Sequence, residues 1–336
     1  MRYEKEAVMK GPIYKWALLS IAMGAFLPEH ADAATEWRPA KNVEIVAGAG
    51  PASSFDRTAR AVQRALRDGK LVDVPVAVIN RPGGGGAIAW NYLNTHSGDG
   101  SYLAVIVPGV LTNRITGSNQ LSHKDLSPLA MLYSEYVLLA VNITSPIKSG
   151  SEFIAALRKD PASLSIGVAT ALGGANHLAA VLALKNAGVD IKKTKFVVFP
   201  SAPESVTAVA GNHIDAVSAS PGNVLPQASR LRLLAVTAPK RLEGALQEVP
   251  TWKEQGVNAV FDSWRGIVGP KGLTRDQVAY WDAIFKRITE DPEWRREATR
   301  NYVVNSYMNS SETDIYLDQQ YKELEELLGA LGLVKY

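Results

Sequence analysis

The turn G48AGPASS54 is the first place where the sequence could hold a ligand. It follows a strand-like run and leads at once into a helical pattern. Gly48 and Gly50 let the backbone turn sharply and come close to a bound molecule. Ser53 or Ser54 is a natural N-cap, so the first N–H groups of the helix point into the turn and suit a carboxylate or a phosphate. An ordinary strand-to-helix turn that binds nothing fits the same residues.

Nucleotide binding is not indicated by this turn. The dinucleotide fingerprint G-x-G-x-x-G needs a glycine at the position of Ser53, and no Gly-Lys pair follows as in a Walker loop. The turn can still hold an anion through its backbone N–H groups. No cofactor is predicted.

A second turn of the same kind, A169TALGG174, again lies between a strand-like run and a helical pattern. Asn176 is a candidate cap for a helix that starts at His177. If the two turns belong to different lobes, they can hold one anion between them. His177 is either a ligand contact or pH-sensitive group, or an ordinary surface or capping histidine.

Two further patterns have simple structural explanations. The run G83GGG86 either lines a site or, as we favour, allows a strand and a helix to pack closely. A stripe of arginines recurs at helical spacing, and a solvated helix face is the favoured explanation for Arg57, Arg60, Arg64 and Arg67.

Residue patterns typical of enzymes are missing from the sequence. It contains no H-E-x-x-H, no G-x-S-x-G and no EF-hand loop, and its five histidines lack metal-ligand spacing. The S-x-x-K match at Ser145–Lys148 lacks its partner motifs. We therefore predict no catalytic residue, no metal and no enzyme. A net charge of +3 on 336 residues is too small to indicate nucleic-acid binding.

The N-terminus has the order of a secretory signal peptide. Lys10 and Lys15 precede the apolar run W16ALLSIAMGAFL27, and the small-residue site A31DA33 follows. The run is too short to span a bilayer, although a buried N-terminal helix is an alternative. We expect residues 1–33 to be removed as a signal peptide, with the first methionine or Met9 as the start.

The chain contains no cysteine. This excludes disulfides, thiolate catalysis, cysteine-ligated metals and a lipid anchor on cysteine. After export we therefore expect a soluble protein of the periplasm that is not lipidated.

Short apolar runs alternate with helical periods along most of the chain, which indicates an α/β fold with doubly wound lobes. Their near-continuous apolar character fits parallel strands covered on both faces. After F261DSWRGIVGPKG272 we expect two amphipathic helices with no strand between them. The expected strands are V43EIVAG48, V74PVAVIN80, Y102LAVIVP108, Y136VLLAVN142, L164SIGVA169, K195FVVFP200, D215AVSAS220 and L231RLLAVTA238.

Several motifs, in one order over nearly the whole chain, resemble those of the solute receptors of tripartite tricarboxylate transporters, the Bug-type periplasmic binding proteins. The matching segments are N80RPGGGGAIA89, S97GDGSYLAVI106, G167VATALGGANHLA179, F199PSAPESVTAVAGNHIDAVSAS220, L233LAVTAPKR241 with V249PTWKEQG256, and S263WRGIVGP270.

The resemblance implies a two-lobed clamshell of the type II-like periplasmic binding protein class, with a doubly wound, mostly parallel sheet in each lobe. It implies lobe 1 over residues 34–138 plus 256–336 and lobe 2 over residues 139–255. A carboxylate ligand in the cleft would then be held by Ala49, Gly50, Pro51, Ser53, Ser54 and Asp56, by Thr170, Ala171, Gly173, Gly174 and His177, and by Ser220 at the floor.

Two positions depart from the family pattern. The first loop is rich in hydroxyl groups around Pro51, where the family usually has a Pro-Gly-Gly core. Arg265 follows Trp264 where an uncharged residue is more common. It is a candidate for bidentate pairing with a second carboxylate, and a rim or interlobe salt bridge is the alternative.

The resemblance implies a non-enzymatic periplasmic receptor that captures a small organic carboxylate. It would deliver the ligand to the permease subunits of a tripartite tricarboxylate-type transporter, and we expect it to act as a monomer. The alternative is an extracytoplasmic carboxylate sensor that signals through a membrane partner. Dicarboxylates, tricarboxylates, amino acids and aromatic acids remain open as ligands.

Overall fold

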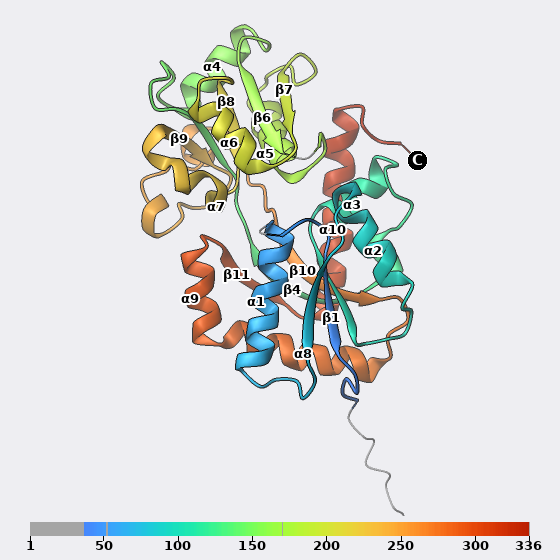
Figure 1. The fold of residues 1–336 in the computed structure, drawn as a ribbon. Coiled ribbons are helices and arrows are strands. Elements are labelled where there is room, and N and C mark those ends of the chain that lie inside the picture. The colour runs from blue at the N-terminus through green and yellow to red at the C-terminus, as the bar shows by residue number, and fades with distance from the viewer. Residues whose placement is uncertain (1–36, 52, 170, 336) are drawn as a thin grey trace, which may run out of the picture. The chain divides into compact units, whose positions relative to one another are not determined.

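A computed structural model of the protein describes residues 37–51, 53–169 and 171–335. The expected signal segment, residues 1–33, lies outside these ranges. Over the described residues the chain forms a six-stranded and a five-stranded sheet, each covered by helices (Figure 1). The described residues belong to one compact unit. No helix among them is long and apolar enough to cross a membrane.

The first sheet has the strand order β11-β4-β10-β3-β1-β2. Its half around β1 is parallel, because β1 pairs with β2 and with β3 in the same direction. The pairs β3–β10, β10–β4 and β4–β11 are antiparallel. The strands are β1 (Val43–Ala47), β2 (Val76–Asn80), β3 (Tyr102–Ile106), β4 (Leu126–Ser134), β10 (Arg265–Pro270) and β11 (Val304–Met308).

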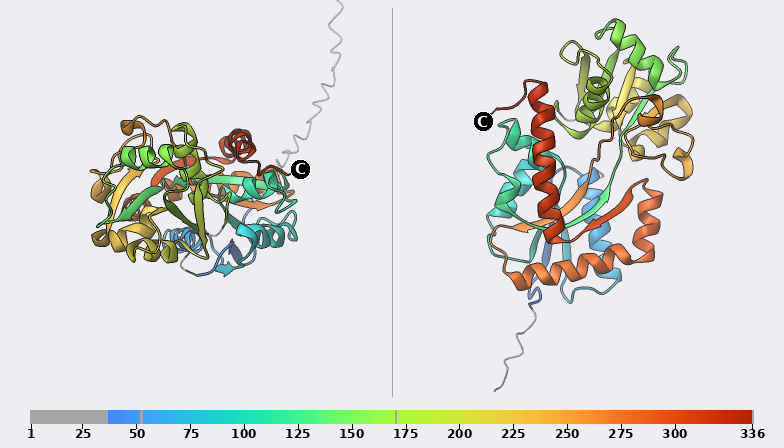
Figure 2. Two further views of the ribbon diagram at one scale, coloured as in Figure 1. Left: turned by 90° about the horizontal axis from the view of Figure 1, so that it is seen from above. Right: turned by 180° about the vertical axis from the view of Figure 1, so that it is seen from behind.

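The helices around the first sheet come from both ends of the chain. Helix α1 packs on β1 and β2, whereas α8 and α10 pack on β4. Seen from behind, α10 runs along the first sheet (Figure 2). The bounds are α1 (Ser54–Asp68), α2 (Ala87–Asn94), α3 (Gly109–Ile115), α8 (Arg275–Glu290), α9 (Pro292–Arg300) and α10 (Ser310–Ala330).

The second sheet has the order β7-β6-β8-β5-β9, and β5 alternates its side chains between the two faces. Leu139 and Val141 join the buried cluster under α4 and α5, while Leu138 and Ala140 join the cluster under α6 and α7. The elements are β5 (Leu138–Asn142), β6 (Ser165–Ala169), β7 (Lys195–Phe199), β8 (Ala216–Ala219), β9 (Leu231–Val236), α4 (Gly150–Lys159), α5 (Ala175–Asn186), α6 (Ala202–Ala210) and α7 (Pro221–Val224).

The chain passes between the sheets twice, and the two crossing segments are paired. Glu135 and Ser263 exchange backbone hydrogen bonds of 3.3 and 2.9 Å. Thr237 is buried beside them, where its hydroxyl accepts from the Val137 N–H and donates to the Phe261 carbonyl, each at 2.9 Å. The crossings therefore form one hydrogen-bonded ribbon, called here the crossing ribbon (residues 135–137 with 261–263 and Thr237).

The structure confirms the α/β class with two sheets and each of the expected strands. It adds β4 and β10, which were not among the expected strands, and it corrects two details. The sheets are mixed rather than mostly parallel, because the strands next to the crossings, such as β4 and β5, run antiparallel to their neighbours. In addition, β11 lies between the C-terminal helices, where we expected no strand. It is an edge strand whose residues are half-exposed or exposed, so it lacks the apolar run that marks a buried strand.

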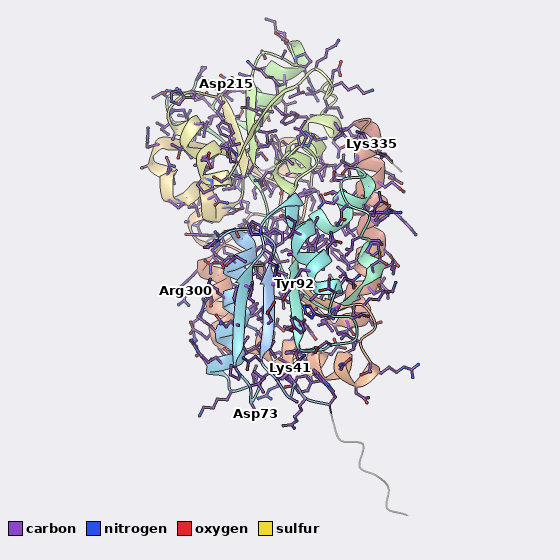
Figure 3. The ribbon with its side chains drawn as sticks, turned by 45° about the vertical axis from the view of Figure 1, so that its right-hand side comes forward. Lys41, Asp73, Tyr92, Asp215, Arg300 and Lys335 are labelled. Atoms are coloured by element: carbon purple, nitrogen blue, oxygen red, sulfur yellow. The ribbon has the colours of Figure 1, made fainter. Side chains whose placement is uncertain are left out.

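The charged side chains of the periphery project away from the two sheets. Lys41, Asp73 and Arg300 are exposed examples (Figure 3). Charged groups that are buried instead are therefore informative.

Candidate ligand site

Helix α1 begins as the sequence predicted, with a serine cap. The hydroxyl of Ser53 accepts a hydrogen bond of 3.2 Å from the Asp56 N–H, and Ser53 itself has extended backbone angles. Ser54 is thus the first helical residue, and its own hydroxyl is not used in this cap. The positive end of the α1 dipole lies at Ser54.

The turn before α1 is held by residues of the neighbouring strand and glycine run. The side-chain amide of Asn80 donates to the Ala49 carbonyl at 2.8 Å and to the Asp56 carboxylate at 3.0 Å. A methyl group on Gly48 would lie 2.8 Å from the Cα of Gly86, so the two backbones approach closely. Gly86 has a φ of 105°, which side chains rarely allow. The glycine run therefore serves packing.

Helix α5 begins differently from our expectation. It starts at Ala175 with Gly174 as N-cap, so Asn176 lies inside the first turn and does not cap the helix. Among the described residues no side chain caps α5, which leaves its first N–H groups as donors for a ligand or for water.

His177 holds the second turn from within. Its Nδ1 accepts a hydrogen bond of 3.0 Å from the Gly173 N–H, and its ring packs edge-on against Phe196. The side chain is only 3% exposed. Burial lowers the pKa of His177 to about 4. The imidazole is therefore neutral near pH 7, and it shapes the turn as an acceptor.

We expect His177 to make the protein sensitive to acid. Between pH 6.5 and about 4 the unfolded chain binds a proton at this position that the folded protein does not bind. The contribution of His177 to the free energy of unfolding is thus fully present above pH 6.5. It falls by roughly 1.4 kcal/mol per pH unit toward pH 4. Urea unfolding at several pH values should show a shallower decline for His177→Asn, which keeps an acceptor for Gly173.

The exposed His213 provides the control, because His213→Asn should keep the wild-type profile. Burial raises the pKa of Asp262 to about 6, which acts in the opposite direction, but both variants retain that group. An equal acid-dependent decline in His177→Asn and wild type would contradict the assignment.

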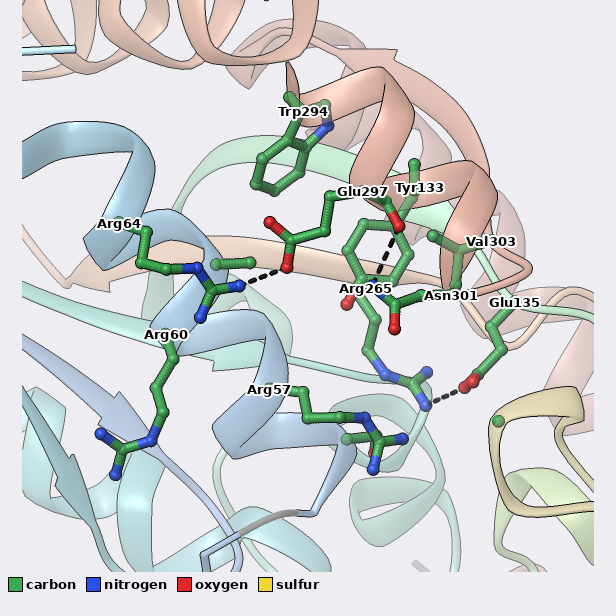
Figure 4. Close-up of a pocket in the computed structure, with 14 residues that line it drawn as sticks. Arg57, Arg60, Arg64, Tyr133, Glu135, Arg265, Trp294, Glu297, Asn301 and Val303 are labelled. Atoms are coloured by element: carbon green, nitrogen blue, oxygen red, sulfur yellow. Dashed lines mark hydrogen bonds and ion pairs between the residues drawn. The ribbon is translucent and has the colours of Figure 1, made fainter. Parts of the chain in front are cut away.

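A groove of about 390 Å³ runs between α1 and α9 (Figure 4). One end is marked by Glu135 and Gly222, and the apolar surface is supplied by side chains that include Ala61 and Trp294. The charged lining consists of four arginines and two glutamates: Arg57, Arg60, Arg64, Arg265, Glu135 and Glu297.

At the floor of the groove lies a buried ion pair. The guanidinium of Arg265 donates to the Glu135 carboxylate at 2.7 Å, and both side chains are 7% exposed. The same guanidinium donates to the carbonyls of Ser263 and Trp264. Because Glu135 and Ser263 belong to the crossing ribbon, the groove floor is directly joined to the connection between the sheets.

Two arginines of α1 also form ion pairs beside the groove. Arg64 forms an ion pair with Glu297 of α9, which ties the two helices together at one end (Figure 4). Arg60 pairs with Asp56 at 2.9 Å. The Asp56 carboxylate is thus directed to Arg60 and Asn80 and does not line the groove.

The structure brings some of the predicted site residues together and separates others. Ser54 and Arg265 line the groove, and Ser220 caps α7 next to the groove residue Gly222, with its hydroxyl accepting from Asn223 at 2.9 Å. Thr170 lies outside the described residues. The loop residues away from the groove lining are Ala49, Gly50, Pro51, Ser53, Ala171, Gly173, Gly174 and His177.

Sequence reasoning missed two contributors to this region. Arg57, Arg60, Arg64 and Arg67 are exposed, which confirms the predicted solvated helix face, but the prediction did not include that the first three also line the groove. Asn80 was noted only as part of a family motif, yet its amide positions the first turn. Helical spacing alone does not reveal which solvent-facing stripe meets another helix. Among the described residues no cluster of three or more metal-ligating side chains occurs.

Two mixed sheets are covered by helices and joined by two paired crossing segments, with glycine turns at helix starts. This is the arrangement of two-lobed solute-binding proteins. The family model described as the tripartite tricarboxylate transporter family receptor matches residues 58–333. The chain belongs to this family, whose members are periplasmic receptors for solutes and in general not enzymes.

Individual relatives agree with this assignment. The chain is similar to the UPF0065 protein in the gbd 5' region of Cupriavidus necator, with 29% identity over 322 residues that cover 95% of this chain and 96% of the relative. It has the fold of R. palustris Rpa4515 with adipate (TM-score 0.78, 22% identity, 88% and 99% of the two chains). It also has the fold of MatC from Rhodopseudomonas palustris with bound malate (TM-score 0.73, 20% identity, 86% and 99%).

Proposed function

We propose that this protein is a periplasmic receptor that captures a small organic carboxylate and performs no chemistry on it. The observation that carries the proposal is that the positive end of α1 lies at Ser54, which also lines the groove. The N–H groups at the start of α5 supply further donors. Two structural relatives were solved with the carboxylates adipate and malate, which supports the same ligand class.

We also propose how the ligand is passed on. The receptor acts as a monomer with lobes 34–138 plus 256–336 and 139–255, and it delivers the acid to permease subunits of a tripartite tricarboxylate-type transporter. The family assignment supports this route. Residues 1–33 would direct export and be removed. Loss of uptake of the bound acid on deletion of the gene supports delivery, whereas unchanged uptake with altered gene expression supports the sensor alternative.

The ligand class is tested by calorimetry and thermal shift on the exported protein. The panel contains aliphatic mono-, di- and tricarboxylates, acidic amino acids, aromatic acids and neutral sugars. At a ligand concentration of about 100 times Kd, binding adds about 2.7 kcal/mol of stability. We expect at least one carboxylate to bind at micromolar Kd or tighter and the sugars to have no effect. Binding of sugars without any acid would overturn the proposal.

A further inference from the structure

The groove between α1 and α9 carries more positive than negative charge on its lining, with four arginines against two glutamates. The Arg64–Glu297 pair closes one end, and the other end has the Arg265–Glu135 pair at its floor. Arg57 lies at this second end. A methyl group on Gly222 would be 3.9 Å from its Nη2, so the guanidinium reaches across to the start of α7. Arg57 and the Arg265–Glu135 pair therefore lie together where the groove meets the start of α7.

Arg57 and Arg265 approach the same place from different elements. Figure 4 shows the guanidinium of Arg57, from α1, extending toward the end of the groove where Arg265 meets Glu135. Both positive charges also act on the Tyr133 hydroxyl, where they oppose the rise in pKa that burial causes. Two arginines of separate elements around one space suit a carboxylate.

Arg265 also has a donor that remains unsatisfied. Glu135, Ser263 and Trp264 accept from its terminal nitrogens, but the buried Nε finds no partner among the described residues. The side chain is 7% exposed, and an unpaired buried donor of a charged group is costly. An anion that comes within hydrogen-bond distance of this Nε would compensate the donor.

The groove is continuous with the start of α1, because Ser54 belongs to both. From Ser54 the lining passes along one face of α1 through Arg57 and Ala61. A molecule held by its carboxylate at the α1 start can thus extend into the groove. Arg57 lies about one helical turn beyond Ser54 on this face, and Ala61 lies about one further turn along.

We propose that the ligand of this receptor carries a second anionic group and that this group binds between Arg57 and Arg265 at the groove floor. The inference rests on the proposed function, since it assumes that a first carboxylate is held at the start of α1. It deepens that function by naming the ligand class as acids with two anionic groups. Arg57 and Arg265 then set the specificity against monoacids.

The test compares acids matched in carbon number: succinate with butyrate, adipate with hexanoate, and pimelate with heptanoate. Calorimetry on the wild-type protein should find at least one diacid bound 30-fold or more tightly than its monoacid. Arg57→Gln should weaken that diacid at least 10-fold and the monoacid less than 3-fold. Arg67→Gln is the matched control on the same helix, because Arg67 is exposed, lies outside the groove and pairs with Asp68. It should change neither affinity.

The possible failures are distinguishable. If monoacids bind as tightly as their diacids, or if Arg57→Gln weakens both by the same factor, the second anion seat is wrong while the carboxylate receptor stands. If no acid of either kind binds the wild-type protein, the proposed function fails, and this inference fails with it. The double variant Arg265→Met with Glu135→Gln removes the floor pair without leaving a lone charge, and it should likewise weaken the diacid at least 10-fold and the monoacid less than 3-fold.

Discussion

Replacing Ser54 with aspartate should weaken the tightest acid of the panel by about 100-fold without destabilising the protein. The new carboxylate would lie at the first residue of α1, in the groove lining, beside the expected position of the ligand's carboxylate. Two like charges about 4 Å apart repel by up to about 4 kcal/mol near a protein surface, and each 1.4 kcal/mol is tenfold in Kd. The same charge is favourable for the helix, by about 0.3–1 kcal/mol.

The control is Ser54→Asn, which has nearly the same shape as aspartate without its charge. Calorimetry should find the Kd of Ser54→Asn within about 5-fold of wild type. This is a change in binding free energy of less than about 1.4 kcal/mol, which would be tenfold. In chemical unfolding, both variants should be at least as stable as the wild-type protein. If Ser54→Asp binds the acid as well as Ser54→Asn does, the start of α1 is not part of the site.

Replacing Glu135 with glutamine should destabilise the fold by about 3–5 kcal/mol. Arg265 would keep its charge in a buried position but lose its ionic partner, and removal of one partner of a buried pair is strongly destabilising. The effect falls on the crossing ribbon, because Glu135 and Ser263 are hydrogen-bonded there. Urea or guanidinium unfolding of the purified variant measures the change.

Two further variants distinguish the destabilisation caused by a buried unpaired charge from that caused by losing any salt bridge. Glu293 pairs with Arg296 and Arg300, but these side chains are exposed to solvent. Glu293→Gln should therefore leave the unfolding midpoint nearly unchanged. The double variant Glu135→Gln with Arg265→Met should regain much of the lost stability, because it no longer buries an unpaired charge. Equal losses in the single and double variants would show that packing, not charge, is responsible.

Much of the fold could be predicted because local patterns and tertiary packing agree. The strand V43EIVA47 is apolar nearly throughout and is buried in the sheet, and Ser53 caps α1 through its own short side chain. The mixed sheet order was not predictable in this way. Strand direction depends on how distant segments such as β4 and β10 meet, and apolar runs contain no information on direction.

The candidate site was likewise only partly predictable from the sequence. Glycine turns and serine caps are local features, so the starts of α1 and α5 could be found from the sequence. The groove depends instead on α9, which brings Trp294 and Glu297 opposite α1 from the far end of the chain. Arg57, Arg60 and Arg64 are exposed, as a solvated face predicts, but nothing local indicates that they also line a groove with a second helix.

His177 illustrates a third case, in which the residue was noticed and its role was not. A histidine at a helix start fits a ligand contact, a pH-sensitive group or a cap. The deciding facts are its near-complete burial and the hydrogen bond from Gly173. Burial comes from packing against Phe196 of β7, which lies outside the local motif.

The paired crossings limit how the two sheets can move. Reciprocal hydrogen bonds between Glu135 and Ser263 prevent one crossing segment from sliding along the other, and Thr237 fastens both. Bending and twisting of the ribbon remain possible, but Leu178, Ala179 and Val181 of α5 share a buried cluster with residues of the first sheet, so this packing also limits the motion. Because the chain has no cysteine of its own, a pair of introduced thiol labels, one beside each sheet, would report how much motion this packing allows.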